Sequence, residues 1–358
     1  MAEKKNNKFK SVMNKIFIDG LSGMATGLFC TLIIGTIIAT LGGYIPGVVG
    51  NYLKFMGTAA KALMGAGIGV GVAIKFKETP LVSISAAVCG TVGAQAAQFA
   101  KFCEEGTFAV AGPGEPLGAF VAAIIGIWIG HLVAGKTPVD IIVTPLCTII
   151  PGSAVGIFFG PYISTFMTWL GGMINWGTEQ QPLLMGIVVS VLMGIFLTLP
   201  ISSAAIGIAL QLGGITAGAA TIGCCCNMIG FAVISYRENK VNGLLAQGLG
   251  TSMLQMPNII RNPRVWIPAI VSSAILGPIS TMVLHMESNA VGSGMGTAGL
   301  VGPISTFTTM VETTSASIVL LEIVVMYFVL PTIICLLISE LLRKIGWIKE
   351  GDLKLDKV

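Results

Sequence analysis

The stretch from Ile318 to Ile338 reads IVLLEIVVMYFVLPTIICLLI and carries a single charged side chain, Glu322. A helix that crosses the hydrocarbon core of a bilayer needs about 20 mostly apolar residues, and this stretch meets that length. A second apolar run, from Ile16 to Leu41, also meets it. That run is too long for the apolar core of a signal peptide and lacks an obvious cleavage site. We therefore read both runs as membrane spans.

The rest of the chain has a similar composition. Of its 358 residues, 54% are hydrophobic and 10% are charged, whereas a soluble domain carries about 25% charged residues. Lipid offers the backbone no hydrogen-bond partner, so only helices or a closed barrel can cross it. Barrel strands alternate in polarity over about ten residues, but the apolar runs here are continuous. The sequence predicts an all-α integral membrane protein with about ten transmembrane helices.

Positive charge gathers at both ends of the chain and in short loops between the apolar runs. Loops rich in Lys and Arg remain on the cytoplasmic side of a membrane. We expect a basic cytoplasmic N-terminus over residues 1–15, a polytopic transmembrane domain over 16–342 and a cytoplasmic tail over 343–358. Both termini on one side require an even number of full crossings.

Glycine and proline break the apolar runs at several places. The sequence GPGEP at residues 112–116 cannot form a regular helix. Residues 243–260 lie between two positive loops, at 237–240 and 261–264, which favours a re-entrant or surface helix over a crossing. The glycine-rich stretch 288–299 is typical of a loop that folds back into the protein. Irregular backbone at membrane depth is tolerated where it is buried in protein or lines a cavity.

Ionisable side chains at membrane depth cost about 2.5–3.5 kcal/mol on insertion scales, which makes them candidates for function. Glu115, in the broken segment, suits contact with a polyol or a cation, and an ordinary extracellular turn explains it equally well. Glu312 follows an apolar run, where a cavity wall and a loop are both consistent with the sequence. His285 and Asn289 open the glycine-rich stretch, and a structural or interfacial role is the alternative for His285.

Neutral polar side chains form a second group of candidates. Amide groups offer paired donors and acceptors that match sugar hydroxyls. Hydrogen bonds between helices, which contribute about 0.6 kcal/mol on average, are the alternative role for each of them. The group comprises Gln211, Thr216, Asn227, Gln255 and Asn258.

Cysteine and motif content argue against catalysis. Three adjacent cysteines, Cys224 to Cys226, could suggest metal or redox chemistry, but the chain has only two histidines and no CxxC pair. We interpret these cysteines as small buried hydrophobic residues. No GxxxxGK[ST], HExxH or GxSxG motif is present. We therefore expect no catalytic residue, metal or cofactor and no nucleic-acid partner.

Several of these features together resemble the IIC membrane subunits of the phosphotransferase system, over nearly the whole chain. The motifs that carry the resemblance are GPGEP at 112–116, the stretch 213–217, Asn227, RENK at 237–240, LQMPN at 254–258 and the glycine-rich loop at 292–299. The resemblance implies about ten helices with re-entrant hairpins. It also implies a homodimer in a bacterial plasma membrane and a domain that carries a sugar across the bilayer.

Two departures from the IIC pattern matter. In glucose-type IIC proteins a Gly-Ile-Thr-Glu motif supplies a carboxylate to the substrate, whereas here Gly214-Ile215-Thr216 is followed by Ala217. No loop is long enough to hold a IIA or IIB phosphocarrier domain, so coupling to phosphorylation would need a separate IIB partner.

Two hypotheses of function follow. The first is a transporter of a small polar solute, a sugar or a related compound, that works by alternating access. The second is a non-transporting membrane sensor or regulator derived from the same fold. The missing motif carboxylate favours the second, and the polar residues gathered in broken apolar segments favour the first. In either case membrane lipid surrounds the chain.

Overall fold

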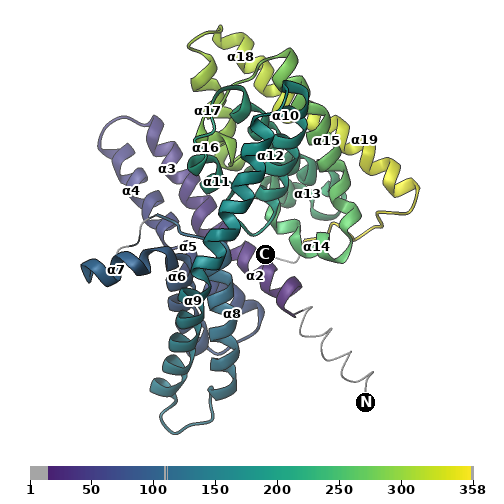
Figure 1. The fold of residues 1–358 in the computed structure, drawn as a ribbon. Coiled ribbons are helices and arrows are strands. Elements are labelled where there is room, and N and C mark those ends of the chain that lie inside the picture. Colours follow the sequence, from purple (N-terminus) through teal and green to yellow (C-terminus); the bar gives the residue numbers. More distant parts are fainter. Residues whose placement is uncertain (1–14, 109, 111, 356–358) are drawn as a thin grey trace. The chain divides into compact units, whose positions relative to one another are not determined.

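The computed structural model describes residues 15–108, 110 and 112–355, and the chain divides into two compact units, Met1–Phe166 and Met167–Val358. Of the basic N-terminus expected over residues 1–15, all but Lys15 lies outside the described residues. Within the described ranges the regular structure is helical (Figure 1), apart from one isolated β-bridge between Gly214 and Ser288. The all-α prediction is confirmed.

The first unit begins with a helix that is continuous from Lys15 to Tyr44 and alternates between π and α geometry. Two pairs of helices follow, the first bent by 54° and the second by 60°. The elements are η1 (Lys15–Gly20), α2 (Leu21–Leu28), η2 (Phe29–Ile33), α3 (Ile34–Tyr44), α4 (Val48–Ala62), α5 (Met64–Lys75), α6 (Pro80–Ala94), η3 (Ala96–Gln98), α7 (Phe99–Glu105) and α8 (Pro116–Val133). Helix α9 (Asp140–Thr178) runs from this unit into the next.

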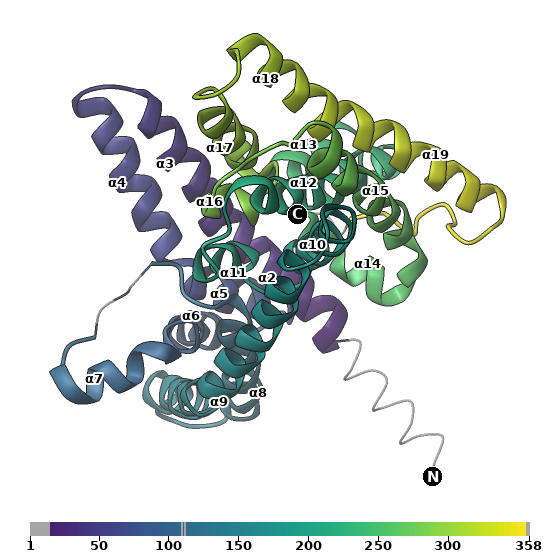
Figure 2. The same cartoon turned by 45° about the horizontal axis from the view of Figure 1, so that its top comes forward.

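Glycine lets the helices of the first unit approach closely. Helix α5 packs against α2 and α6, and α6 packs against α8. A Cβ atom at Gly23 would lie 2.5 Å from the carbonyl oxygen of Gly71, and a Cβ at Gly65 would lie 2.5 Å from that of Gly90. Small residues at such contacts allow the backbone-to-backbone packing that stabilises helices in lipid. Helices α3 and α4 form a hairpin, and they run side by side in Figures 1 and 2.

The second unit contains shorter and more frequently broken elements. They are α10 (Pro182–Thr198), α11 (Ser203–Ala209), α12 (Gly214–Ile234), α13 (Tyr236–Leu245), η4 (Ala246–Gly250), η5 (Ser252–Gln255), α14 (Met256–Arg261), η6 (Pro263–Trp266), α15 (Ile267–Pro278), η7 (Ile279–Val283), α16 (Ala290–Ser293), η8 (Ala298–Leu300), α17 (Val301–Met310), α18 (Ala316–Ile323), η9 (Val324–Val329) and α19 (Leu330–Lys344). Residues 243–260 form four short pieces, as expected of a segment that does not cross.

Helix α12 is the centre of the second unit. In the most apolar 18-residue stretch of this helix, 94% of the residues are buried. Helices α10, α15 and α19 pack around α12 (Figures 1 and 2). Most of the side chains of α12 are small. The three cysteines Cys224 to Cys226 are fully buried, and Gly223 lies directly against the backbone of Ser190 on α10. The interpretation of these cysteines as small core residues is confirmed.

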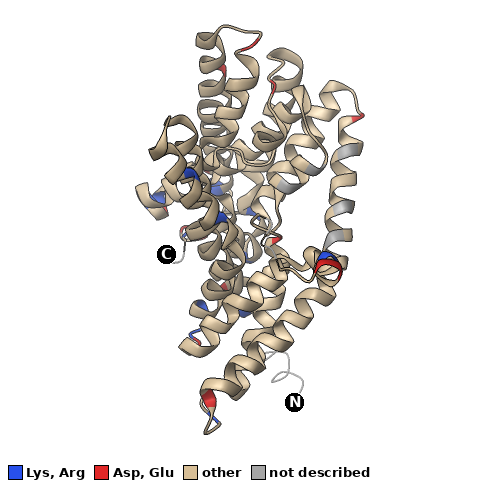
Figure 3. Ribbon diagram, turned by 90° about the vertical axis from the view of Figure 1, so that its left-hand side faces the viewer, with Lys and Arg blue, Asp and Glu red and all other residues tan. Residues whose placement is uncertain are grey.

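The described residues contain six helices that are long and apolar enough to cross a membrane, or up to eight if each bent pair counts as one span. About ten were expected. Hydropathy alone would divide residues 139–176 near Pro161 into two apolar segments, but they lie in one helix, α9, which continues through Pro161. The apolar residues 203–235, in contrast, do not form one span, because the chain breaks between α11 and α12. Charged residues occupy only short patches of the ribbon in Figure 3, in keeping with a membrane-embedded chain.

A cluster of polar side chains lies within the core of the second unit. Asn227, midway along α12, is fully buried. Its Nδ2 donates to the Gly223 carbonyl at 3.1 Å and to Ser273 Oγ at 3.4 Å. Its Oδ1 accepts from Trp266 Nε1 at 2.8 Å and from Thr198 Oγ1 at 3.3 Å. Both donors and both acceptor positions of the amide are therefore used inside the protein.

We predict that Gly223→Ala destabilises the protein. The added Cβ would overlap the carbonyl of Ser190, so α10 and α12 must separate. Overpacking of this kind costs about 1–3 kcal/mol, and the melting temperature of the protein in nanodiscs should fall. Gly172→Ala on α9 is the matched control, because a Cβ there meets no atom within 4 Å. An equal fall in both variants would contradict this account of the α10–α12 contact.

We also predict that Asn227→Leu lowers the melting temperature. The substitution removes all the hydrogen bonds of the fully buried Asn227 amide and leaves the half-buried Trp266 indole N–H without its acceptor. Loss of a buried hydrogen-bond partner costs about 1–3 kcal/mol. Asn242→Ala, at an exposed position of α13, is the control and should have little effect. If Asn227→Leu were as stable as the unaltered protein, the hydrogen bonds of Asn227 would not support the fold.

Candidate functional site

Two broken segments of the second unit meet at the beginning of α12. The first runs from Leu199 to Gly213 and contains only the short helix α11. The second runs from Leu284 to Leu300 and contains the short helix α16. They contact each other through α11 and α16, and the Gly214–Ser288 bridge joins the second segment to the first residue of α12. We call this place the junction.

The sequence breaks the helices here through left-handed backbone positions. Gln211, which lies between α11 and α12, has φ of 50°, and His285, which follows η7, has φ of 47°. A side chain in this region of φ is uncommon and strained, which marks a candidate functional position. Gly214 and Gly296, with φ of 55° and 52°, adopt similar conformations without a Cβ penalty.

Short contacts hold the second segment against the first segment and against the start of α12. Ser203 Oγ donates to the Gly294 carbonyl at 2.7 Å, and the Ser288 N–H donates to the Gly214 carbonyl at 3.2 Å. A Cβ at Gly207 would overlap Ser293 Oγ, and one at Gly218 would overlap the carbonyl of Met286. The glycine-rich stretch thus folds back into the protein, as predicted: most of residues 292–298 are buried.

The junction presents both acceptors and donors. Ser288 Oγ is buried and has no hydrogen-bond partner among the described residues, which is unusual for a native hydroxyl. Glu287 beside it is half-buried. Asn289 Oδ1 accepts from the N–H groups of Val291 and Gly292, at 3.1 and 3.0 Å, so its Nδ2 is not used by this cap.

Backbone donors complete the junction. Gly213 has no side chain to cap α12, and the N–H groups of the first turn of a helix have no partner within the helix. They also carry the positive end of the helix dipole. Together with the Glu287 carboxylate and the Ser288 hydroxyl, these groups could bind a neutral ligand with several hydroxyls, each of which both donates and accepts.

Four residues predicted from the sequence lie in or beside the junction. Gln211 is exposed just before α12, and His285 is exposed within the second segment. Asn289 caps α16. Thr216, in the first turn of α12, donates from Oγ1 to Met185 Sδ at 3.3 Å. The structure therefore brings these four into one region, although their role in binding remains a prediction.

The other five predicted residues lie elsewhere. Asn227 is in the buried polar cluster. Gln255 and Asn258 are buried and bind the main chain of the C-terminal tail. Glu312 is in the exposed turn between α17 and α18. Glu115 belongs to the first unit, where its N–H donates to the Ala94 carbonyl at 2.9 Å at the start of α8.

Ser288 and Glu287 were not among the predicted site residues. The only signal for them in the sequence is the polar run from His285 to Asn289, just before the glycine-rich stretch. A buried, unpartnered serine cannot be recognised in a sequence that contains many membrane-embedded serines. No three His, Cys, Asp or Glu side chains gather as a metal site within the described ranges.

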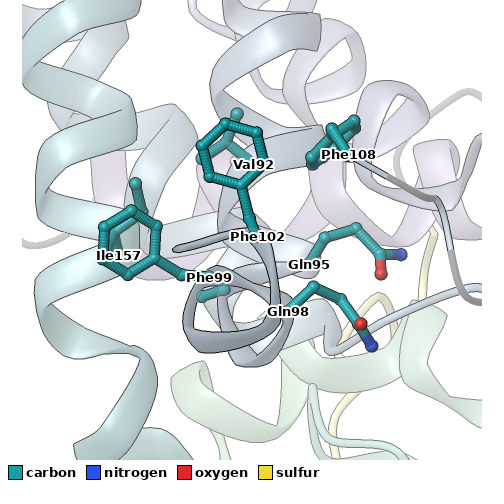
Figure 4. Close-up of a pocket in the computed structure, with 8 residues that line it drawn as sticks. Val92, Gln95, Gln98, Phe99, Phe102, Phe108 and Ile157 are labelled. Carbon is teal, nitrogen blue, oxygen red and sulfur yellow. The ribbon is translucent and has the colours of Figure 1, made fainter. Parts of the chain in front are cut away.

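Two cavities lie away from the junction and are mainly apolar. One, of about 330 Å³, is in the first unit, and Figure 4 shows the side chains that surround it. It is lined by Val92, Gln95, Ala96, Gln98, Phe99, Phe102, Phe108 and Ile157. The other, of about 380 Å³, is lined by Trp169, Gly172, Met173, Trp176 and Leu192. Neither has the charged or hydroxyl side chains that distinguish the junction.

The chain was compared with curated proteins and with models of protein families. No curated protein matches the chain. The family model described as phosphotransferase system, EIIC, matches residues 18–355, which is nearly the whole chain. The helical fold, the spans and the broken segments agree with the resemblance seen in the sequence. The chain therefore belongs to the EIIC family, the membrane permease components of the phosphotransferase system.

Proposed function

We propose that this chain carries a sugar or sugar alcohol across the membrane by alternating access, with the junction as its solute site. The observation that supports this most is the buried, unpartnered Ser288 hydroxyl, which lies where two broken segments meet beside a carboxylate and the start of α12. Solute sites in many transporters are built from broken helices of this kind. Gln211, His285 and Asn289 would add exposed polar groups around the solute.

The carboxylate of this site comes from a different place than in glucose-type relatives. Ala217, which stands where their motif has Glu, is fully buried in an apolar cluster. The adjacent Gly218 touches the backbone of Met286, and a Cβ there would lie 3.3 Å from the nitrogen of Glu287. We propose that Glu287 supplies the carboxylate from the second broken segment.

The family implies a sugar substrate and separate IIA and IIB partners. We propose that a phosphorylated IIB protein modifies the solute at the cytoplasmic face. We also propose that both termini lie in the cytoplasm and that the chain acts as a homodimer. On this proposal the phosphoryl group is supplied by the phosphorylated IIB partner.

A binding measurement tests the site. We predict that Ser288→Ala weakens sugar binding about two- to twelvefold, for a lost hydrogen bond of about 0.5–1.5 kcal/mol. Glu287→Gln should weaken it by about tenfold or more, because a bond to a charged group contributes about 1.5–3 kcal/mol. The affinity is measured by thermal shift or calorimetry in nanodiscs, after a screen of sugars, sugar alcohols and phosphosugars.

Ser339→Ala provides the matched control for this experiment. Ser339 on α19 is also buried and also lacks a hydrogen-bond partner among the described residues, but it is not at the junction. Its substitution should leave the affinity unchanged. If a sugar binds and all three variants bind it as the unaltered protein does, the solute site is not at the junction.

A transport measurement tests the activity. Proteoliposomes that contain the purified chain should take up at least one sugar of the panel, and addition of a phosphorylated IIB protein should convert it to the phosphosugar. Glu287→Gln should abolish most of this uptake. A sugar that binds to the purified protein but does not accumulate with any candidate IIB partner would contradict transport and support the sensor hypothesis.

Besides the missing motif carboxylate, one structural observation supports the sensor hypothesis: the C-terminal tail is anchored to the second unit, as described below. On that hypothesis a partner recognises the tail over residues 343–358. Arg343 forms a buried ion pair with Glu238, at 2.8 Å, so a truncation that begins at Trp347 is less disruptive than one that begins at Arg343. The truncation should abolish partner binding; unchanged regulation would contradict the hypothesis.

A further inference from the structure

The end of the chain folds back onto the second unit. Helix α19 ends at Lys344, and residues 347–355, here called the C-terminal strap, run along the broken stretch 239–262. Leu353 of the strap is fully buried, and Ile348 is 2% exposed. The Arg264 guanidinium lies over the Trp347 ring at 5.0 Å. The strap is thus a packed element and not a free tail.

Amide side chains hold the main chain of the strap. The Leu353 carbonyl accepts from Asn239 Nδ2 at 2.8 Å and from Gln255 Nε2 at 3.0 Å. The Lys354 carbonyl accepts from Asn258 Nδ2 at 3.0 Å, and the Leu355 N–H donates to Asn239 Oδ1 at 2.8 Å. These bonds explain why Gln255 and Asn258 are buried amides.

The same amides continue into the protein. Gln255 Nε2 also donates to Gln247 Oε1 at 2.9 Å, and Asn258 Nδ2 donates to Gln255 Oε1 at 2.7 Å. Three residues before Gln255 in the same short helix, Ser252 Oγ lies 2.8 Å from Thr198 Oγ1. Thr198 in turn donates to Asn227 Oδ1 at 3.3 Å. Hydrogen bonds and one short helix therefore connect the strap to the polar cluster on α12.

Opposing forces act on the strap. Each neutral hydrogen bond contributes little net stability in water, since the strap can bond to water when it is free. Burial of Leu353 favours docking. The conformational entropy of nine ordered residues opposes it. A change in the geometry of residues 246–258 would misalign several of these bonds together, because Gln255 and Asn258 serve both the strap and the interior.

We propose that the C-terminal strap is a releasable conformational device whose docking is coupled to the polar cluster at Asn227. A rearrangement of α10 or α12 at Thr198 and Asn227 moves the short helix with Ser252 and Gln255, and the strap is then released. By thermodynamic reciprocity, an undocked strap loosens the contact between Ser252 and Thr198. This coupling lies within the second unit and does not depend on which solute the chain carries.

Hydrogen exchange of the full chain in nanodiscs tests the coupling. Thr198→Val removes the hydroxyl that contacts Ser252 and Asn227, far in sequence from the strap. We expect exchange in the peptide 347–355 to rise at least about fivefold, the lower end of typical coupling factors. Thr306→Val is the matched control: it removes an equally buried hydroxyl, bonded to the Tyr327 hydroxyl at 2.7 Å, and should leave the strap unchanged.

A second variant tests the reverse direction. Leu353→Ala should release the strap and also raise exchange in peptides that contain Thr198 and Ser252. Ser252→Ala removes the same internal contact from the other side and replaces Thr198→Val if that variant does not fold. If exchange in the strap stays at its unaltered rate in the folded Thr198→Val or Ser252→Ala protein, the strap is a purely structural support and the proposal fails.

Discussion

In lipid, every backbone N–H and C=O group needs a hydrogen-bond partner within the protein. This requirement determines the structure. Where the chain is almost entirely apolar, as in residues 318–338, a continuous helix meets that need within itself. In the second unit, Gly, Pro and polar residues gather around 199–213 and 284–300, and the helices break there. The backbone groups freed by these breaks must find partners in other segments. The second broken segment finds such partners in the first segment, through Gly294 with Ser203, and at the start of α12, through Ser288 with Gly214. The solute site that we propose lies where this mutual satisfaction is incomplete.

Glycine makes the arrangement possible because it allows polar backbone groups to approach closely. Gly207 and Gly218 leave no room for a side chain against the second segment, and Gly223 leaves none against α10. The helix α12 can therefore sit at the centre of the unit, with its first turn at the junction and Asn227 in the buried cluster. The same helix links the proposed solute site to the polar cluster at Asn227, to which we propose that docking of the C-terminal strap is coupled.

Much of the fold could be predicted from the sequence, because length and hydropathy alone identify a span such as 318–338. The broken character of 112–116, 243–260 and 288–299 was also predictable from Gly, Pro and flanking charge. The number of spans could not be predicted from the sequence. Hydropathy cannot show that α9 continues through Pro161, or that the apolar residues 203–235 divide at Gln211. The site was predicted only in part. Amides were the expected ligands of a solute, yet Asn227, Gln255 and Asn258 are occupied by protein groups, and composition cannot distinguish these uses.

The most direct test of the account is to locate the bound solute. Hexose and hexitol probes that carry a photoreactive diazirine would be crosslinked to the unaltered protein in nanodiscs, with excess unlabelled sugar as competitor, and the modified peptides identified by mass spectrometry. The account predicts crosslinks, suppressed by the competitor, in the segments around 207–216 and 285–293. Competed crosslinks confined to the first unit, around Glu115 or the cavity beside Phe99 and Phe102, would contradict it.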